Sequence, residues 1–154
     1  MSEKTVFKEK DADDSPGFLL FKITVLWQKK LGIIFNDLRI QQTQYAILAS
    51  LKFYEEKNEK CTQAFLVEHA RIDKMTLSKS VRQLEKSGLV RRTQSEEDAR
   101  AVIVNLTSKG RKLVTEAVQR IEDADESFFQ YLTEKQRCSF KEISLALIKG
   151  NSES

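Results

Sequence analysis

The stretch that decides the fold spans residues 62–92 and reads TQAFLVEHARIDKMTLSKSVRQLEKSGLVRR. Its pattern predicts two helices, separated by a four-residue turn and followed directly by a strand. The apolar residues of the second helix recur at helical spacing, at Leu77, Val81 and Leu84. Asp73 is a favourable N-cap for this helix, and Gly88 stands where a helix often takes a left-handed residue after its last turn. The sequence therefore predicts a helix-turn-helix whose second helix runs over about residues 74–87.

The second predicted helix carries a polar face between its buried positions. This face, rich in cations and short hydroxyls, comprises Lys74, Met75, Thr76, Ser78, Lys79 and Arg82. Such side chains bond to phosphates and base edges when a helix lies in the DNA major groove. We expect Lys74 to lie nearer the phosphate backbone than the others. By itself a polar helix face is more often solvated surface, so the DNA-binding interpretation depends on the tight turn before the helix and on the segment after it.

Residues 89–106 predict a two-stranded ribbon. Val102, Val104 and Leu106 alternate as in a half-buried strand. Residues 89–93 can pair with them antiparallel, which leaves a charged tip at about residues 94–100. Because a two-stranded ribbon is only marginally stable alone, it must pack on the helices as a wing.

With this wing in place, the chain resembles the MarR family of bacterial multiple-antibiotic-resistance regulators. The motif R-x5-D-x-R is formed by Arg92, Asp98 and Arg100. The motif V-x-V-x-L-T-x-x-G follows, at Val102, Val104, Leu106, Thr107 and Gly110. The resemblance extends in weaker form over roughly residues 18–149. It implies a mainly α (α+β) winged helix-turn-helix, with Arg100 as a minor-groove arginine at the wing tip and Asp98 holding it by an ion pair.

The chain departs from the family pattern at several positions. Ala99 replaces the usual second basic residue of the wing, and Glu96 and Glu97 add negative charge there, which predicts weak wing affinity. Arg71 stands where the family often has glycine, so the turn either avoids a left-handed conformation or bears some strain. Phe65 stands at a position that is usually polar and outward-facing, and the sequence gives no firm account of it.

The rest of the chain predicts one domain with dimerisation helices. Residues 1–17 are expected to form a flexible N-terminal arm, and residues 18–150 a single MarR-type domain. Within it, the DNA-binding lobe covers about residues 38–107, and the dimerisation helices cover about 18–36 and 108–149. The first of these helices carries an apolar stripe too wide for one subunit to bury. The resemblance implies that the first and the last two helices of two subunits interleave in a homodimer.

Charge is segregated along the chain. Residues 69–112 hold eleven Lys or Arg against five Asp or Glu, a net charge of +6, whereas residues 113–135 carry −4. In a symmetric dimer the basic segment would be doubled, and two recognition helices roughly 34 Å apart would contact a pseudo-palindrome. If some 8 phosphates were neutralised, log K would fall with log salt at a slope of about −7. We therefore expect a sequence-specific, dimeric, DNA-binding transcriptional regulator.

A small aromatic or phenolic effector is a further expectation from the resemblance, because many relatives release DNA when such an acid binds between the dimer helices and the DNA-binding lobe. The candidate lining residues are Phe18, Phe21, Trp27 and Tyr45. Aromatic residues at helical spacing are, however, more often core. The competing function is a helical dimer that acts through protein partners after losing DNA binding, and the acidic wing tip is the best argument for it.

Other function classes find little support. No apolar run approaches the roughly 18 residues of a membrane span, and the first 14 residues hold eight charges, so we expect a cytoplasmic protein without a signal peptide. The sequence holds no pattern typical of a nucleophile–base pair, a metal cluster or a phosphate loop, so neither an enzyme nor a cofactor is expected. Cys61 and Cys138 are far apart in the sequence, which favours buried or idle thiols, and His69 is expected at the surface or in a cap.

Overall fold

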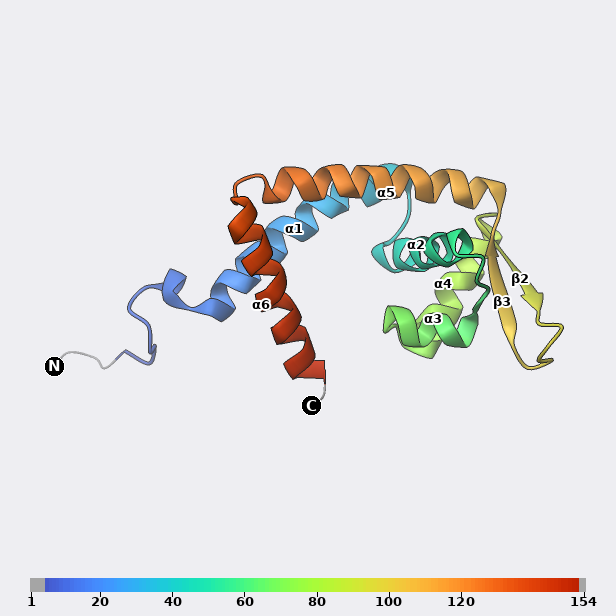
Figure 1. Cartoon of the computed structure of the whole chain (residues 1–154), viewed down its shortest axis with the longest axis horizontal. Helices are drawn as coiled ribbons and strands as arrows, with labels where there is room; N and C mark the ends of the chain where they lie inside the picture. The colour runs from blue at the N-terminus through green and yellow to red at the C-terminus, as the bar shows by residue number, and fades with distance from the viewer. Residues whose placement is uncertain (1–4, 153–154) are drawn as a thin grey trace.

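A computed structural model describes residues 5–152, which form two parts (Figure 1). Its elements are the 3-10 helix η1 (Ala12–Asp14), α1 (Pro16–Leu38), α2 (Gln42–Glu56), β1 (Cys61–Thr62), α3 (Gln63–Ala70), α4 (Lys74–Lys86), β2 (Val90–Gln94), β3 (Val102–Leu106), α5 (Ser108–Phe129) and α6 (Glu134–Ser152). The elements from α2 to β3 gather at one end, and we call them the lobe. Helices α1, α5 and α6 extend away from it, and we call them the limb. The mainly α, winged helix-turn-helix fold is confirmed.

Helix α1 begins within the segment predicted to be an arm. The Ser15 hydroxyl accepts a hydrogen bond from the backbone N–H of Phe18 at 3.4 Å, and Pro16 occupies the first helical position, where its missing N–H costs nothing. Residues 16 and 17 therefore belong to the limb. Of the predicted arm, residues 1–4 lie outside the described residues, and the flexibility of residues 5–15 stays a prediction.

The helix-turn-helix forms where the sequence placed it. The Asp73 carboxylate caps α4 by accepting from the Thr76 N–H at 2.9 Å, and this bond holds the pKa of Asp73 below its ordinary value. Helix α4 ends at Lys86, one residue earlier than expected, and Gly88 adopts a left-handed φ of 72°. Arg71 also adopts a left-handed φ, of 51°, so of the two alternatives for this turn the strained one holds.

The sheet has three strands rather than the two expected. Strand β3 lies in the middle of the order β1-β3-β2, and β2 pairs with it antiparallel from Val90 opposite Leu106 to Gln94 opposite Val102. The added strand β1 pairs Cys61 with Val104. Two residues are too few to show an alternating pattern, so the sequence could not reveal β1. Cys61, a residue of β1, is buried, and burial raises the pKa of its thiol, whereas Cys138 is exposed.

The lobe has its own hydrophobic core. The largest fully buried side chains come from five elements, and they are Ile47, Leu48, Leu66, Leu77, Leu84, Val81, Val104 and Val114. Burying each side chain of this size stabilises the fold by about 1.5–3 kcal/mol relative to leaving it in water. Since Val114 belongs to α5, the first turns of that helix are part of the lobe core, and its remaining turns extend into the limb.

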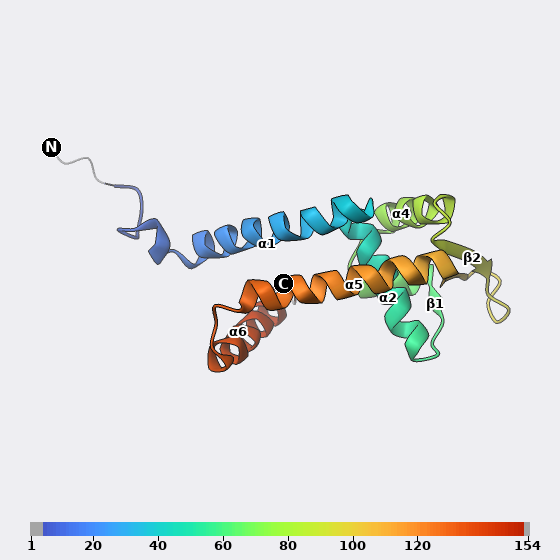
Figure 2. The same cartoon turned by 90° about the horizontal axis from the view of Figure 1, so that it is seen from above.

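The limb is held to itself by polar and aromatic contacts between α1 and α5, which lie side by side (Figure 2). Arg120 bonds to Asp37 at 2.7 Å, and the Trp27 and Phe128 rings meet edge to face with centroids 5.2 Å apart. Large apolar side chains nevertheless remain exposed on α1 and α6, among them Leu20, Phe21, Leu26, Ile143 and Leu147. The limb therefore presents a broad apolar surface.

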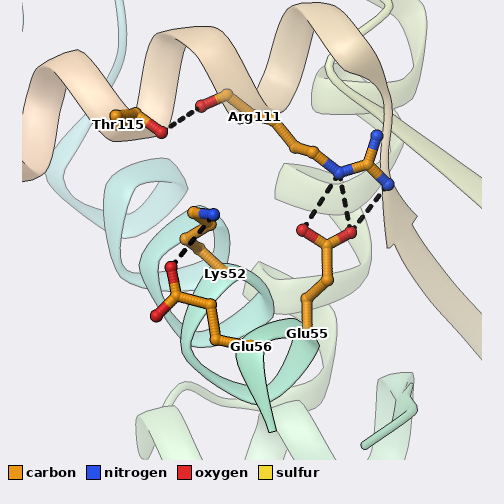
Figure 3. Close-up of polar contacts among 5 residues, drawn as sticks. All are labelled: Lys52, Glu55, Glu56, Arg111 and Thr115. Atoms are coloured by element: carbon orange, nitrogen blue, oxygen red, sulfur yellow. Dashed lines mark hydrogen bonds and ion pairs between the residues drawn. The ribbon is translucent and has the colours of Figure 1, made fainter. Parts of the chain in front are cut away.

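A bidentate ion pair joins the lobe to the start of α5 (Figure 3). The Arg111 guanidinium donates from Nε to both carboxylate oxygens of Glu55, at 2.8 and 3.0 Å, and its Nη2 lies 2.7 Å from Glu55 Oε1. Lys52 pairs with Glu56 one turn away on α2, at 3.0 Å. The hydrogen bonds from Arg111 hold the pKa of Glu55 below its ordinary value. The pair thus fixes the angle between α2 and α5.

This pair predicts a pH-dependent contribution to stability. A carboxyl whose pKa is lower in the folded protein stabilises it above the unfolded pKa, about 4.3 for Glu, and this contribution disappears as pH falls through the folded pKa. We expect Glu55→Gln to lower the urea unfolding midpoint at pH 7, and we expect this deficit to shrink as the pH falls from 7 to 3. Lys52→Met, which breaks the neighbouring pair, is the control. An equal deficit for Glu55→Gln at both pH values would contradict this role.

Candidate nucleic-acid interface

The exposed face of α4 gathers all six side chains that the sequence predicted for it. Lys74, Met75, Thr76, Ser78, Lys79 and Arg82 line one shallow, open surface groove, together with Gln83 and Lys86. The last two were missed by the sequence interpretation. They follow Lys79 and Arg82 at the four-residue helical interval, so the spacing of the predicted face carried the signal. We call these eight residues the α4 face.

The rotation of α4 is fixed by its opposite side. Leu77, Val81 and Leu84 are fully buried in the lobe core, and Ser80 is buried beside them. Because these residues cannot turn outward without losing their packing, the intervening cations and hydroxyls must face solvent. Asp73 and Glu85, the acidic residues in or next to α4, bond instead to the Thr76 amide and to Arg92.

Two internal contacts order the α4 face. The Gln63 side-chain amide of α3 donates to the Ser78 hydroxyl oxygen at 2.7 Å, and Arg82 Nε donates to the Ser78 carbonyl at 3.3 Å. Since the Ser78 oxygen accepts from Gln63, its own hydroxyl proton is directed elsewhere and remains able to donate. Gln63 therefore positions Ser78 from the neighbouring helix.

Arg92 ties the wing to α4. Its guanidinium bonds to Glu85 through Nε at 2.9 Å and through Nη2 at 2.8 Å, and its backbone N–H donates to the same carboxylate at 3.3 Å. These bonds hold the pKa of Glu85 below its ordinary value. The side chain of Arg92 thus lies between β2 and the last turn of α4, where it helps to set the angle of the wing. A contact of Arg92 with DNA stays a prediction.

The prediction of an ion pair between Asp98 and Arg100 at the wing tip is wrong. Asp98 Oδ1 instead accepts from the backbone N–H of Arg100 at 2.9 Å, and its carbonyl accepts from Ala101. In a tight turn, an aspartate side chain readily accepts a hydrogen bond from the backbone amide two residues later. Across residues 5–152 no ion pair engages Arg100. Its side chain and Lys74 line a second groove, between the wing and α3.

The start of α5 anchors the end of α4. The Thr107 hydroxyl donates to the Gly88 carbonyl at 2.6 Å, and Lys109 Nζ donates to the Ser87 carbonyl at 2.9 Å. Gly110 makes the closest approach, because a Cβ added there would lie 2.0 Å from the Leu89 carbonyl oxygen. Helix α5 can therefore pass directly over the end of α4 only with glycine at this position.

Comparison with known proteins agrees with this geometry. Residues 34–125 match the family model described as "ArnR1-like, winged-helix domain". The chain is 34% identical to an HTH-type transcriptional regulator of Bacillus subtilis, YdcH, over 79% of its own length and 83% of the relative. Wild-type MarR of E. coli in its apo form shares the fold, with a TM-score of 0.68, 20% identity and coverage of 87% of this chain and 97% of MarR. This chain belongs to the MarR family.

The MarR-family chain is thus a winged-helix transcriptional regulator. A second relative, the transcriptional repressor Rv2887 of Mycobacterium tuberculosis, is 26% identical over 86% of this chain and 93% of the relative. A MarR mutant of E. coli complexed with operator DNA has a TM-score of 0.76 at 20% identity, covering 92% of this chain and 99% of that one. The solved MarR structure with operator DNA therefore shares the overall fold of this chain.

The four aromatic residues predicted to line an effector pocket in this MarR-family protein lie in three separate ring pairs. Phe18 and Phe21 stack on each other at the start of α1, with centroids 6.4 Å apart. Trp27 packs on Phe128, and Tyr45 packs on Phe35 with centroids 5.5 Å apart. The last two pairs join α1 to α5 and to α2. The four rings therefore do not form one cluster within the subunit.

Phe65 belongs to an aromatic cluster. The sequence did not explain why this MarR-family regulator has an aromatic residue at that position. Its ring stacks on His69 with centroids 5.5 Å apart and meets Tyr54 edge to face at 4.9 Å. The cluster joins α3 to the end of α2.

Within residues 5–152, no group of three His, Cys, Asp or Glu side chains is arranged to hold a metal ion. Over the same residues, none of the helices is long and apolar enough to span a membrane.

Proposed function

We propose that this MarR-family regulator is a homodimer that binds a pseudo-palindromic DNA operator with sequence specificity. The observation that carries this proposal is the α4 face, which holds four cations and two hydroxyls and, in the structure of residues 5–152, no outward carboxylate of its own. Such a face is complementary to phosphates at its edges and to base acceptors at its centre. The regulator is not an enzyme, and it acts in the cytoplasm, where it meets its operator.

The wing supplies the second contact with DNA. Arg100 carries the tip cation, and the Asp98 turn holds its backbone without neutralising its guanidinium. An arginine at the wing tip fits the narrow minor groove of A·T-rich DNA beside each half-site. Glu96 and Glu97 reduce the attraction of this tip for phosphates, so the wing contributes less to affinity than α4 does.

The apolar surface of the limb is the proposed dimer interface. Exposed side chains on α1 and α6, such as Phe21, Leu26 and Ile143, need a partner surface, and a second copy of the chain supplies the same helices. A dimer also gives the α4 face a second copy, placed one duplex turn away at roughly 34 Å. Two linked contacts convert a weak half-site into a specific operator.

We propose release from DNA by a small aromatic or phenolic acid as a secondary feature. It is supported by the ring pairs at the junctions of α1 with α2 and α5, where an inserted ring would change the angle between limb and lobe. A thermal-shift screen with phenolic acids tests it. Stabilisation that is lost in Trp27→Ala supports the idea, and the absence of stabilisation by any of the acids excludes it.

DNA binding itself is tested by fluorescence anisotropy on a random duplex at several salt concentrations. We expect binding in dilute salt and a log–log slope of about −7, as for some 8 neutralised phosphates. Failure to bind any duplex in dilute salt would contradict the proposal. It would favour the competing function, a helical dimer that acts through protein partners, for which the acidic wing tip is the supporting feature.

Arg100→Ala should weaken binding to both operator and random duplex and should remove the preference for A·T pairs beside the half-sites. The reason is that the arginine contributes both a charge and a fit to the narrow minor groove. Glu97→Gln, at the same tip, is the matched control and should strengthen binding to random duplex. Unchanged affinity of Arg100→Ala in both titrations would exclude the wing from the interface.

A further inference from the structure

Met75 is an apolar side chain exposed on an otherwise polar and cationic surface. It is the second residue of α4, and 83% of it is exposed to solvent. The inward side of α4 is complete without it, because Leu77, Val81 and Leu84 fill the core. The fold of the subunit therefore gives no reason for an apolar residue here.

The dimer interface does not account for Met75 either. The exposed apolar side chains of the limb lie on α1 and α6, whereas most of α4 lies in the lobe, apart from the limb (Figures 1 and 2). Where α6 approaches the turn before α4, the contact is polar, between Arg71 and Ser152 at 3.0 Å. The neighbours of Met75 on the α4 face are Lys74, Thr76 and Lys79. An exposed apolar side chain among polar ones is expected to contact a partner whose own surface presents an apolar group among polar ones.

The major groove of DNA presents such a point. The thymine 5-methyl is the apolar group on its base edges, and the first residues of a recognition helix are those that reach the bases. Methionine is unbranched and polarisable, so it adapts to a methyl group without a fixed rotamer. The Asp73 cap bonds to the Thr76 amide at 2.9 Å, which fixes the backbone on both sides of Met75.

We propose that Met75 is a specificity-determining residue that recognises thymine in each half-site by contact with its 5-methyl group. This inference rests on the proposed DNA-binding function. Replacing thymine by deoxyuridine removes only that methyl. Losing it should weaken binding about fourfold per half-site, and about 15-fold when both half-sites are changed, which corresponds to about 0.8 kcal/mol for each buried methyl.

The test begins with a duplex selected by the full-length protein from a randomised library. Each thymine position is then replaced by deoxyuridine, symmetrically in both half-sites, and the Kd is measured for the parent and for three variants. Met75→Ala should lose the dependence on one thymine methyl, and Met75→Leu should retain most of it. Lys86→Ala, at the other end of the α4 face, should bind every duplex more weakly and keep the full dependence.

The outcomes separate this inference from the proposed function. A deoxyuridine-sensitive position whose effect disappears in Met75→Ala supports the assignment. Binding with no sensitive position, or with a sensitivity that Met75→Ala retains, overturns it and leaves DNA binding intact. Failure of the parent protein to select any duplex overturns the proposed function, and the assignment of Met75 with it. Because Met75 is so exposed, circular dichroism should confirm that its variants fold normally.

Discussion

Gly110→Ala is expected to destabilise the lobe by about 3 kcal/mol or more, and to abolish DNA binding with it. The added methyl would lie 2.0 Å from the Leu89 carbonyl oxygen and 3.0 Å from its carbonyl carbon. These are backbone atoms, which cannot move aside as a flexible side chain can. The same carbonyl accepts from the Thr107 N–H at 3.1 Å, so α5 would have to lift away from the end of α4. Overpacking of this severity lies at or beyond the upper end of the usual range.

Urea denaturation followed by circular dichroism measures this effect. Gly17→Ala is the matched control, because no atom lies within 4 Å of the Cβ that it would add near the start of α1. That variant should stay within about 0.5 kcal/mol of the parent. If Gly110→Ala were equally close to the parent, α5 would not be locked to α4 through this contact.

Leu26→Glu is expected to give a monomer whose affinity for the operator is lower by at least about 100-fold. Leu26 is 59% exposed on the limb, and the proposed homodimer would bury it. A carboxylate without a partner is costly to bury, and twofold symmetry introduces it twice. The monomer would also lose the effective-concentration advantage of two linked half-site contacts, which is about 10²–10⁴.

Analytical ultracentrifugation and anisotropy would measure the two consequences separately. Phe53→Glu is the control, because Phe53 is 51% exposed but lies on α2 of the lobe. We expect that variant to remain a dimer. A Leu26→Glu protein that stays dimeric would place the dimer interface elsewhere, and one that is monomeric but keeps full affinity would remove the need for a dimer.

Signals that act over a few residues made much of the fold predictable. Asp73 caps α4 and Gly88 follows it because capping and left-handed turns are decided by adjacent residues. The pairing of β2 with β3 follows from alternation, and Thr107 caps α5 by accepting from the Gly110 N–H at 3.0 Å. The α4 face was predictable for the same reason, because helical spacing separates it from the buried residues.

Contacts between distant segments were not predictable. Strand β1 exists only because β3 offers a free edge to two residues that have no pattern of their own. Arg92 pairs with Glu85 across seven positions, and this ion pair between wing and helix has no signal in the sequence. Phe65 is explained only by the rings of Tyr54 and His69, which come from two helices.

Arg71 shows a third kind of limit. The sequence left its conformation open, and the structure gives it a left-handed φ of 51°, which costs a residue with a side chain about 1–2 kcal/mol. The guanidinium of Arg71 donates to the Ser152 hydroxyl on α6 at 3.0 Å. The Arg71 side chain, which a glycine at this position would not provide, thus connects the helix-turn-helix to the limb. Nothing in the sequence around Arg71 or Ser152 predicts this contact.

The number of chains bound to one operator duplex tests the central claim most directly. Sedimentation of the full-length protein with a selected, labelled duplex, combined with protection mapping, gives both stoichiometry and footprint. We predict two chains per duplex and two protected major-groove segments centred roughly 34 Å apart along one face of the DNA. One chain per duplex, or a single continuous footprint without twofold symmetry, would contradict the account of a dimer that presents paired copies of the α4 face.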